Sequence, residues 1–300
     1  MKTRFLCATC VPVCLFAGMY VTARQQNVFR ARVDAVRVDV LVTQGKRLVA
    51  GLTADDFEVL DNGVPQRVAV VTTTGPVTVA LVLDTSQSVE GDRLRGLIAA
   101  SQRLVDMLRP GDVASLVTFS ERLSLQVAPV GDLAAMRTAL AGVRPRGVTA
   151  MWDALFAGVS LVSGGAGRSL VILLTDGGDN ASWLTDAQVI DTVKRSDAVV
   201  CVFIAGKTGT PMIDWLAPLR TVAGESGGSV FTADWGTRLP QLLVSVLEEF
   251  RARYLLTFEP TGVRRDDGWH KLEVRLKGSK GRVQARPGYY ATQPRSEREK

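Results

Sequence analysis

The chain contains the stretch Val79-Ala80-Leu81-Val82-Leu83-Asp84-Thr85-Ser86-Gln87-Ser88, in which an apolar run ends in a carboxylate and several hydroxyl groups. A short continuous apolar run before a polar loop is typical of a strand that is buried on both faces. In an extended segment, alternation places Asp84, Ser86 and Ser88 on one side. Carboxylate and hydroxyl oxygens suit a small divalent cation, so this strand end predicts a metal site. A Ser-rich cap of the following helix is the alternative explanation.

Two further loops carry oxygen-bearing side chains. Gly147-Val148-Thr149 leads into a helical pattern, and Thr175-Asp176-Gly177-Gly178-Asp179 follows the apolar run 170–174. In a doubly wound sheet, ligands bind beyond the carboxyl ends of the strands, where the strand order reverses. We therefore expect the three loops to converge there. Asp179 is either a residue that orients its loop or an ordinary turn residue, and Asp153 is expected to stabilise the start of a helix.

The three loops together resemble the von Willebrand factor A domain. The metal-ion-dependent adhesion site of that family reads Asp-x-Ser-x-Ser, then a Thr on a second loop, then an Asp on a third. The match falls on Asp84, Ser86, Ser88, Thr149 and Asp176. At the spacer position Gln87 the family often has Gly, which puts the shape of the loop in question more than metal binding.

The resemblance also implies how the site would work. The hydroxyls of Ser86, Ser88 and Thr149 would bind the cation, and Asp84 and Asp176 would bind it directly or through water. Mg²⁺ is the expected ion, with Mn²⁺ or Ca²⁺ as alternatives. A shell dominated by neutral hydroxyls leaves much of the ion's charge uncompensated, so an open position would take an Asp or Glu carboxylate from a partner protein.

From about residue 76 to 253, apolar runs alternate with helical patterns. This order predicts an α/β fold with a doubly wound, mostly parallel sheet and helices on both faces, as in the Rossmann-like A domain. Asp132 is the expected cap of one helix, and Thr185-Asp186-Ala187-Gln188 is a capping box at the start of another.

The two flanks, residues 34–74 and 254–291, show the period-two pattern of β-strands instead. Neither flank has enough strands to be stable by itself, so we expect the two to pair into one small antiparallel sheet or sandwich. Asp61-Asn62-Gly63 predicts a tight turn between a strand at 57–60 and a return strand at 68–71. The segments 51–59, 254–256 and 287–290 also resemble a bacterial family of exported proteins related to the von Willebrand factor A domain.

Both chain ends have distinct compositions. Residues 1–23 have the basic start, apolar middle and small-residue end of a secretory signal peptide, with cleavage expected after Ala23 and an uncleaved membrane anchor as the alternative. Cleavage removes three of the cysteines and leaves Cys201, so no internal disulfide can form. Export without disulfides fits the bacterial envelope, either periplasmic or secreted. Residues 292–300 are polar and are expected to be disordered.

The composition and motifs of the chain argue against nucleic-acid binding and against an enzyme. The formal charge is +6, but the Lys and Arg residues are spread along the chain, which does not indicate a nucleic-acid interface. His270 is the only histidine and lies outside the A-like region, and no Asp-x-Asp motif stands at the end of the strand at 79–83, so an enzyme is not expected. We expect an exported, metal-dependent protein-binding module. The alternatives are a structural or assembly subunit with a vestigial metal site and, less favoured, a metal-dependent hydrolase.

Overall fold

The computed structural model describes residues 35–71, 75–163, 167–205, 216–234, 236, 238–264, 268–278 and 281–291. The predicted signal peptide and the predicted disordered tail lie outside these residues. Within them, no helix is long and apolar enough to cross a membrane.

A six-stranded sheet forms the centre of the α/β part, in the order β11-β10-β9-β6-β7-β8. Its strands are β6 (Val77–Asp84), β7 (Val113–Phe119), β8 (Leu123–Val130), β9 (Arg168–Thr175), β10 (Val199–Ala205) and β11 (Val230–Ala233). Every neighbouring pair is parallel except β7 and β8, which are antiparallel. The chain proceeds from β6 to β8 on one side and from β9 to β11 on the other, so the strand order reverses between β6 and β9. The predicted doubly wound, mostly parallel sheet is confirmed.

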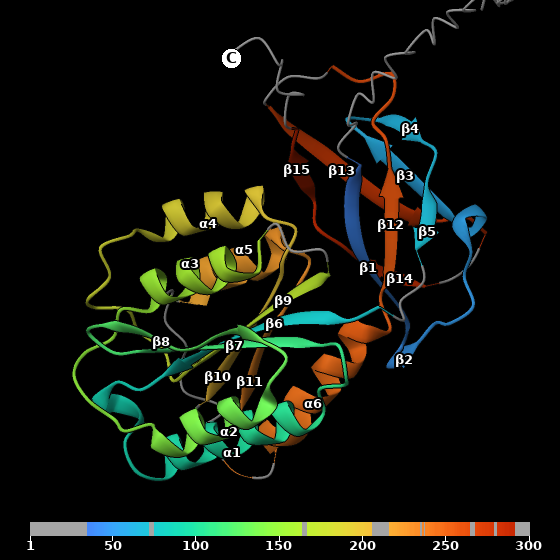
Figure 1. Cartoon of the computed structure of the whole chain (residues 1–300). Coiled ribbons are helices and arrows are strands. Elements are labelled where there is room, and N and C mark those ends of the chain that lie inside the picture. The colour runs from blue at the N-terminus through green and yellow to red at the C-terminus, as the bar shows by residue number, and fades with distance from the viewer. Residues whose placement is uncertain are drawn as a thin grey trace, which may run out of the picture. The chain divides into compact units, whose positions relative to one another are not determined.

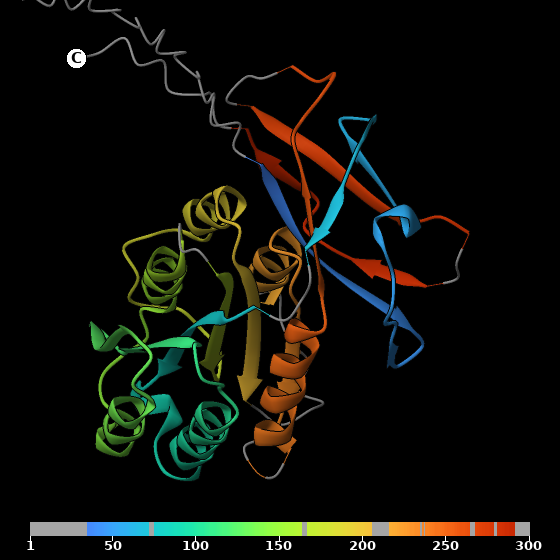
Figure 2. The same cartoon turned by 45° about the vertical axis from the view of Figure 1, so that its right-hand side comes forward.

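Helices cover both faces of this sheet, and Figures 1 and 2 show the two layers. One face carries α1 (Asp92–Asp106), α2 (Leu133–Gly142) and α6 (Arg238–Arg251); the other carries α3 (Met151–Val162), α4 (Asp186–Arg195) and α5 (Leu216–Glu225). Alternate side chains of β6 enter the two cores, with Leu81 packing toward α1 and Val82 toward α3. The predicted cap at Asp132 and the capping box at Thr185 are both present.

The flanking segments form two further sheets. Their strands are β1 (Val36–Gln44), β2 (Arg47–Leu48), β3 (Phe57–Asp61), β4 (Val64–Gln66), β5 (Ala69–Val71), β12 (Tyr254–Phe258), β13 (Trp269–Leu276), β14 (Arg282–Gln284) and β15 (Gly288–Tyr290). One sheet has the order β14-β1-β12-β5, with β2 paired to β1, and the other has the order β15-β13-β3-β4. Each sheet combines strands from before and after the α/β part, and the apolar side chains of the two sheets share one core.

The first hairpin differs from the sequence prediction. The return strand after Asn62-Gly63 is β4, at Val64–Gln66, rather than residues 68–71. Asn62 and Gly63 both have positive φ, 47° and 83°, so a two-residue turn brings the chain back at once. The expected return segment instead becomes β5, which pairs with β12 in the other sheet.

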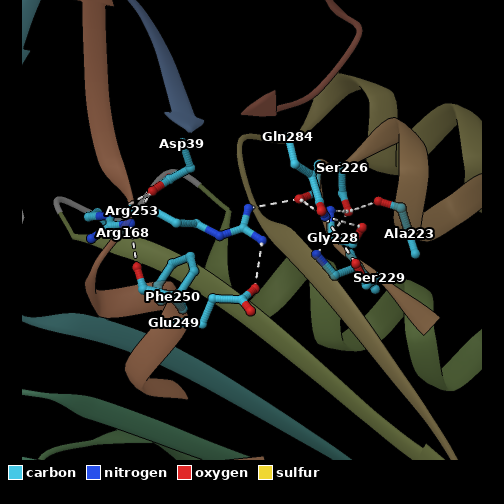
Figure 3. Close-up of polar contacts among 12 residues, drawn as sticks. Asp39, Arg168, Ala223, Ser226, Gly228, Ser229, Glu249, Phe250, Arg253 and Gln284 are labelled. Atoms are coloured by element: carbon cyan, nitrogen blue, oxygen red, sulfur yellow. Dashed lines mark hydrogen bonds and ion pairs between the residues drawn. The ribbon is translucent and has the colours of Figure 1, made fainter. Parts of the chain in front are cut away.

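A buried polar network joins β1 to the ends of β9 and α6 (Figure 3). Arg168 donates from Nε to Oδ1 of Asp39 at 2.7 Å and from Nη2 to the carbonyl of Phe250 at 2.7 Å. Arg253 donates to the carbonyl of Gly227 at 2.7 Å. The Arg168 and Asp39 side chains are 4% and 7% exposed, so removal of either partner would leave an uncompensated buried charge. The network therefore fixes the β strands to the α/β part through specific polar contacts.

Candidate metal site

The site lies at the carboxyl edge of the six-stranded sheet, where the strand order reverses. β6 and β9 are neighbouring parallel strands, so Asp84 at the end of β6 and Asp176 just after β9 come to the same edge. The loop before α3 is attached to the loop after β6 by two backbone hydrogen bonds. Arg146 N donates to Thr85 O at 2.8 Å, and Gln87 N donates to Gly147 O at 2.9 Å. The three loops therefore converge.

Four of the predicted ligands form one hydrogen-bonded chain. Oδ1 of Asp84 accepts from the amide of Ser86 at 2.8 Å. The Oγ atoms of Ser86 and Ser88 are 2.9 Å apart, and Oγ of Ser88 donates to Oδ1 of Asp176 at 2.8 Å. Ser86 is buried and Ser88 is exposed, so the chain of oxygens runs from the interior to the surface.

Thr149 is held beside this chain by its backbone. Its amide donates to Oδ1 of Asn180 at 2.8 Å, and its carbonyl accepts from the amides of Asn180 and Ala181 at 3.0 and 3.1 Å. Among the described residues, no hydrogen bond joins its hydroxyl to the other four predicted ligands. The side chain is buried at the same edge, and its backbone position is fixed by the loop that follows Asp176.

Asp84 is a buried carboxylate with no positively charged partner among the described residues. Its side chain is fully buried, and Oδ2 accepts from Oγ1 of Thr175 at 2.7 Å. Burial raises the pKa of Asp84, the hydrogen bonds from Thr175 and Ser86 oppose that rise, and the nearby charge of Asp176 adds to it. A carboxylate in this environment disfavours ionisation unless a cation compensates it.

Asp176 differs from Asp84 because it does have a cationic partner. Nη1 of Arg93, in the first turn of α1, lies 3.0 Å from Oδ2 of Asp176 and also donates to the carbonyl of Ser88 at 2.9 Å. Sequence reasoning missed Arg93. Its position near the start of the helix after Ser88 is the signal that could have indicated it.

Asp179 ties the loop after β9 to the start of α3. Its Oδ1 accepts from the amide of Met151 at 2.7 Å and from Oγ of Ser182 at 2.5 Å. Asp153 lies in the first turn of α3 and contacts the loop in return: its carboxylate accepts from the amides of Trp183 and Leu184 at 3.0 and 2.9 Å. The two carboxylates thus join the loop to the helix that begins just after Thr149. The role of Asp153 in holding this loop was not predicted.

The chemistry of the donors fits a small, hard cation. The five predicted ligands bring two carboxylates and three hydroxyls, and all their donor atoms are oxygens, as Mg²⁺ or Mn²⁺ prefers. Within the described part of the chain, no group of three or more His, Cys, Asp or Glu residues lies close enough together to hold a metal ion. The predicted set contains only two such residues, so its capacity to hold a cation depends on the hydroxyls.

Comparisons with known proteins agree with this fold. Residues 79–178 match the family model of the von Willebrand factor type A domain. No curated protein matches the chain. A structure of proximal thread matrix protein 1 from the mussel byssus, with a zinc-occupied MIDAS motif, is 20% identical with a TM-score of 0.52; the match covers 63% of this chain and 49% of that one.

Two bacterial structures are also similar. BatB from Bacteroides thetaiotaomicron is 17% identical with a TM-score of 0.48, over 58% of this chain and 98% of that one. A von Willebrand factor type A protein from Catenulispora acidiphila is 17% identical with a TM-score of 0.48, over 84% of this chain and 76% of that one.

Proposed function

Because residues 79–178 match the von Willebrand factor type A domain, a protein-interaction module, we propose that this chain binds a partner protein through a divalent cation. Asp84, Ser86, Ser88, Thr149 and Asp176 hold the cation, and the partner supplies an Asp or Glu carboxylate. One observation carries the proposal: Asp84 is a fully buried carboxylate whose described contacts include hydroxyl and amide donors but no cation. A positive ion at this edge would remove the electrostatic cost of that burial.

The residues at this edge of the sheet have separate roles in the proposed site. Asp84 is oriented by Thr175 and by the amide of Ser86, so its carboxylate is fixed before any ion binds. Ser86 and Ser88 add neutral oxygens, and Asp179 holds the loop after β9 against α3. A bound Mg²⁺ with an open coordination position supplies the attraction for the carboxylate of the partner.

Thermal unfolding of the full chain in chelator and in excess Mg²⁺ tests metal binding. An ion at 100 times its Kd stabilises the folded state by about 2.7 kcal/mol, so we expect a clear rise in Tm. Ser88→Ala should lose most of this rise. Ser160→Ala is a matched control, because Ser160 is exposed on α3 and its hydroxyl donates to the carbonyl of Phe156 in the same helix. If Mg²⁺ raises the Tm of both variants equally, Ser88 is not a ligand. If Mg²⁺ does not raise the Tm of the wild type, there is no metal site.

Partner binding needs a second experiment. The protein should capture a partner from an envelope extract in Mg²⁺ and lose it in chelator. Capture that is equal in chelator would argue against recognition bridged by a metal.

A structural or assembly subunit is the second candidate, and the contact between Arg93 and Asp176 favours it. The guanidinium already supplies a positive charge at 3.0 Å from Oδ2 of Asp176, so part of the site is neutralised without an ion. In that case neither Mg²⁺ nor Mn²⁺ would change the Tm, and Asp84→Ala would not alter the response. A metal-dependent hydrolase is less favoured; turnover in a hydrolase screen that is lost in Ser86→Ala would establish it.

We propose that the protein is exported to the bacterial envelope, on the signal-peptide pattern at residues 1–23. N-terminal sequencing of the protein from its host should begin at Arg24. An intact Met1 on protein that fractionates with membranes would instead favour an uncleaved anchor.

A further inference from the structure

Trp183 is the most exposed large apolar side chain of the described residues, at 95%. An indole ring is among the largest apolar groups in proteins, and aromatic residues dominate the binding energy of protein interfaces. We infer that Trp183 is the apolar anchor of a docking surface beside the metal site, and that the partner segment carries a large apolar side chain next to its acidic residue. This inference rests on the proposed function for the acidic residue and adds the apolar one.

The backbone of Trp183 is fixed, although its ring is exposed. Its amide donates to Oδ2 of Asp153 at 3.0 Å, and the amide of Leu184 donates to Oδ1 of the same carboxylate at 2.9 Å. The preceding residue, Ser182, accepts from the amide of Trp152 at 3.0 Å and donates to Asp179. An aromatic side chain on a fixed backbone loses little conformational entropy when it binds, which is what an interface anchor requires.

Trp183 is close enough to the metal site for one partner to reach both. The Thr149 carbonyl accepts from the amide of Ala181 at 3.1 Å. The Cα of Ala181 is about 1.5 Å from its amide nitrogen, and the two residues from Ala181 to Trp183 span at most ~7 Å. The Cα of Trp183 therefore lies within about 12 Å of the Thr149 carbonyl. A standard interface covers about 800 Å² on each partner, equivalent to a patch roughly 30 Å across. The same partner molecule can therefore contact the cation and the indole.

Two further apolar side chains belong to this surface. Val148, directly before Thr149, is 49% exposed, and Phe156 is 40% exposed. Phe156 lies three residues after Asp153 on α3, so it is a neighbour of the carboxylate that holds Trp183. We call Trp183, Phe156 and Val148 the tryptophan surface.

The charges beside the tryptophan surface favour an acidic partner. Arg93 and Arg146 are both exposed at the edge that carries the predicted ligands. Two exposed acidic residues nearby have partners of their own. Glu90 accepts from Gln87, and the pKa of Glu121 is lowered by its backbone hydrogen bond, by a hydrogen bond with Ser120 and then by the charges of Arg146 and Arg122. A carboxylate from the partner thus meets positive groups, while its apolar neighbour reaches the indole.

Selection from a library of random displayed peptides tests the inference on the immobilised full chain with Mg²⁺. We expect the wild type to enrich peptides in which an Asp or Glu stands next to an aromatic or large aliphatic residue. Trp183→Ala should lose the apolar preference and bind the selected peptides at least tenfold more weakly, as expected for a hot spot. Its exposure means that the fold should survive, which an unchanged Tm would verify. Leu125→Ala, at a 51% exposed site on β8, is the matched control and should change neither property.

Asp176→Ala separates this inference from the proposed function. It should remove the acidic preference and the dependence on Mg²⁺ but keep the apolar preference. If Asp176→Ala selects the same acidic peptides as the wild type, the metal-bridged function fails. If Trp183→Ala selects the same peptides as the wild type, or the wild type shows no apolar preference, the tryptophan surface fails. A wild-type dimer in sedimentation that Trp183→Ala dissolves would also overturn the inference, because a second copy would then be the occupant.

Discussion

Nη1 of Arg93 lies 3.0 Å from Oδ2 of Asp176, so a cationic side chain contacts one of the predicted metal ligands. The Arg93 side chain is 47% exposed and that of Asp176 is 10% exposed, which makes this a partly solvated ion pair. The guanidinium and a divalent cation would compete for the same carboxylate. Arg93 should therefore weaken metal binding, while it compensates the charge of Asp176 in the absence of metal.

Arg93→Ala should bind Mg²⁺ more tightly than the wild type. A partly exposed ion pair is worth up to about 1 kcal/mol, and the loss of ~0.7 kcal/mol of competition corresponds to about threefold in Kd. Isothermal titration calorimetry would measure the change. Arg95→Ala is the matched control, because Arg95 lies on the same helix and pairs with Asp92 instead. Equal or weaker Mg²⁺ binding in Arg93→Ala would mean that Arg93 supports the site rather than competing with the ion.

Asp84→Asn should stabilise the metal-free protein and remove its response to Mg²⁺. The substitution keeps the shape of the side chain but removes a buried charge that lacks a cationic partner among the described residues. A gain of about 1 kcal/mol raises the Tm by roughly 3 °C in a chain of this size. Such a trade between stability and function is common at binding sites. Calorimetric scans in chelator and in Mg²⁺ would measure both effects, and a lower Tm in chelator would show that the charge of Asp84 stabilises the fold.

The fold could be predicted because its signals are local. The apolar runs at 79–83 and 170–174 mark strands buried on both faces, and the alternation of apolar runs with helical patterns along this part of the chain indicates a mostly parallel sheet. The predicted position of the return strand in the first hairpin was wrong because β4 has only three residues and contains Pro65. A strand this short has no periodicity to detect, whereas the turn chemistry of Asn62-Gly63 could have located it.

The sequence indicated where in the fold the candidate site residues lie, but not which other side chains contact them. Asp84 and Asp176 follow apolar runs, so the rule for parallel strands brings them to one edge. The contact of Arg93 with Asp176 joins residues 83 positions apart, and that of Thr175 with Asp84 joins residues 91 positions apart. Such partners depend on how the side chains pack in three dimensions. The hydrogen bonds that Asp153 accepts from the loop at Trp183 could not be predicted either, because no spacing in the sequence indicates them.

Asp112 provides a test of acid stability away from the site. Burial acts to raise its pKa, but hydrogen bonds from Arg251 and from the amides of Arg109 and Val77 outweigh burial and lower the pKa below its usual value. A carboxyl group with a lowered pKa in the folded state stabilises the fold above its unfolded pKa. That contribution is lost as the pH falls through the folded pKa.

Asp112→Asn should therefore cost about 3 kcal/mol at neutral pH, because Arg251 is left buried without its counter-charge. Unfolding curves should show a constant gap between the variant and the wild type at neutral pH, and the gap should narrow below about pH 4. Asp106→Asn is the control: its partner Arg137 is 50% exposed, so the loss should stay within about 1 kcal/mol. A gap for Asp112→Asn that does not change with pH would contradict the role of its charge.

Tyr289→Phe should destabilise the β strands that come from opposite ends of the chain. The Tyr289 hydroxyl donates to Oδ2 of Asp61 at 2.7 Å, and Nδ1 of His270 lies 2.8 Å from Oδ1 of the same carboxylate. All three side chains are buried, so the variant removes a donor from a carboxylate that water cannot reach. The cost of leaving such an acceptor without this donor is about 1–3 kcal/mol. A lower urea midpoint with an unchanged m-value would report it.

Tyr290→Phe is the matched control for this last prediction, because it removes a hydroxyl from the adjacent residue of the same strand. The Tyr290 hydroxyl donates to Oδ1 of Asp191 at 3.1 Å in a partly buried position, and Asp191 also accepts from Arg195. Water and Arg195 can compensate Asp191, so the loss should be under about 1 kcal/mol. Equal midpoints for the two variants would mean that Asp61 is stabilised by His270 without help from Tyr289. A larger loss for Tyr289→Phe would instead establish that the buried carboxylate of β3 depends on a hydroxyl supplied from β15.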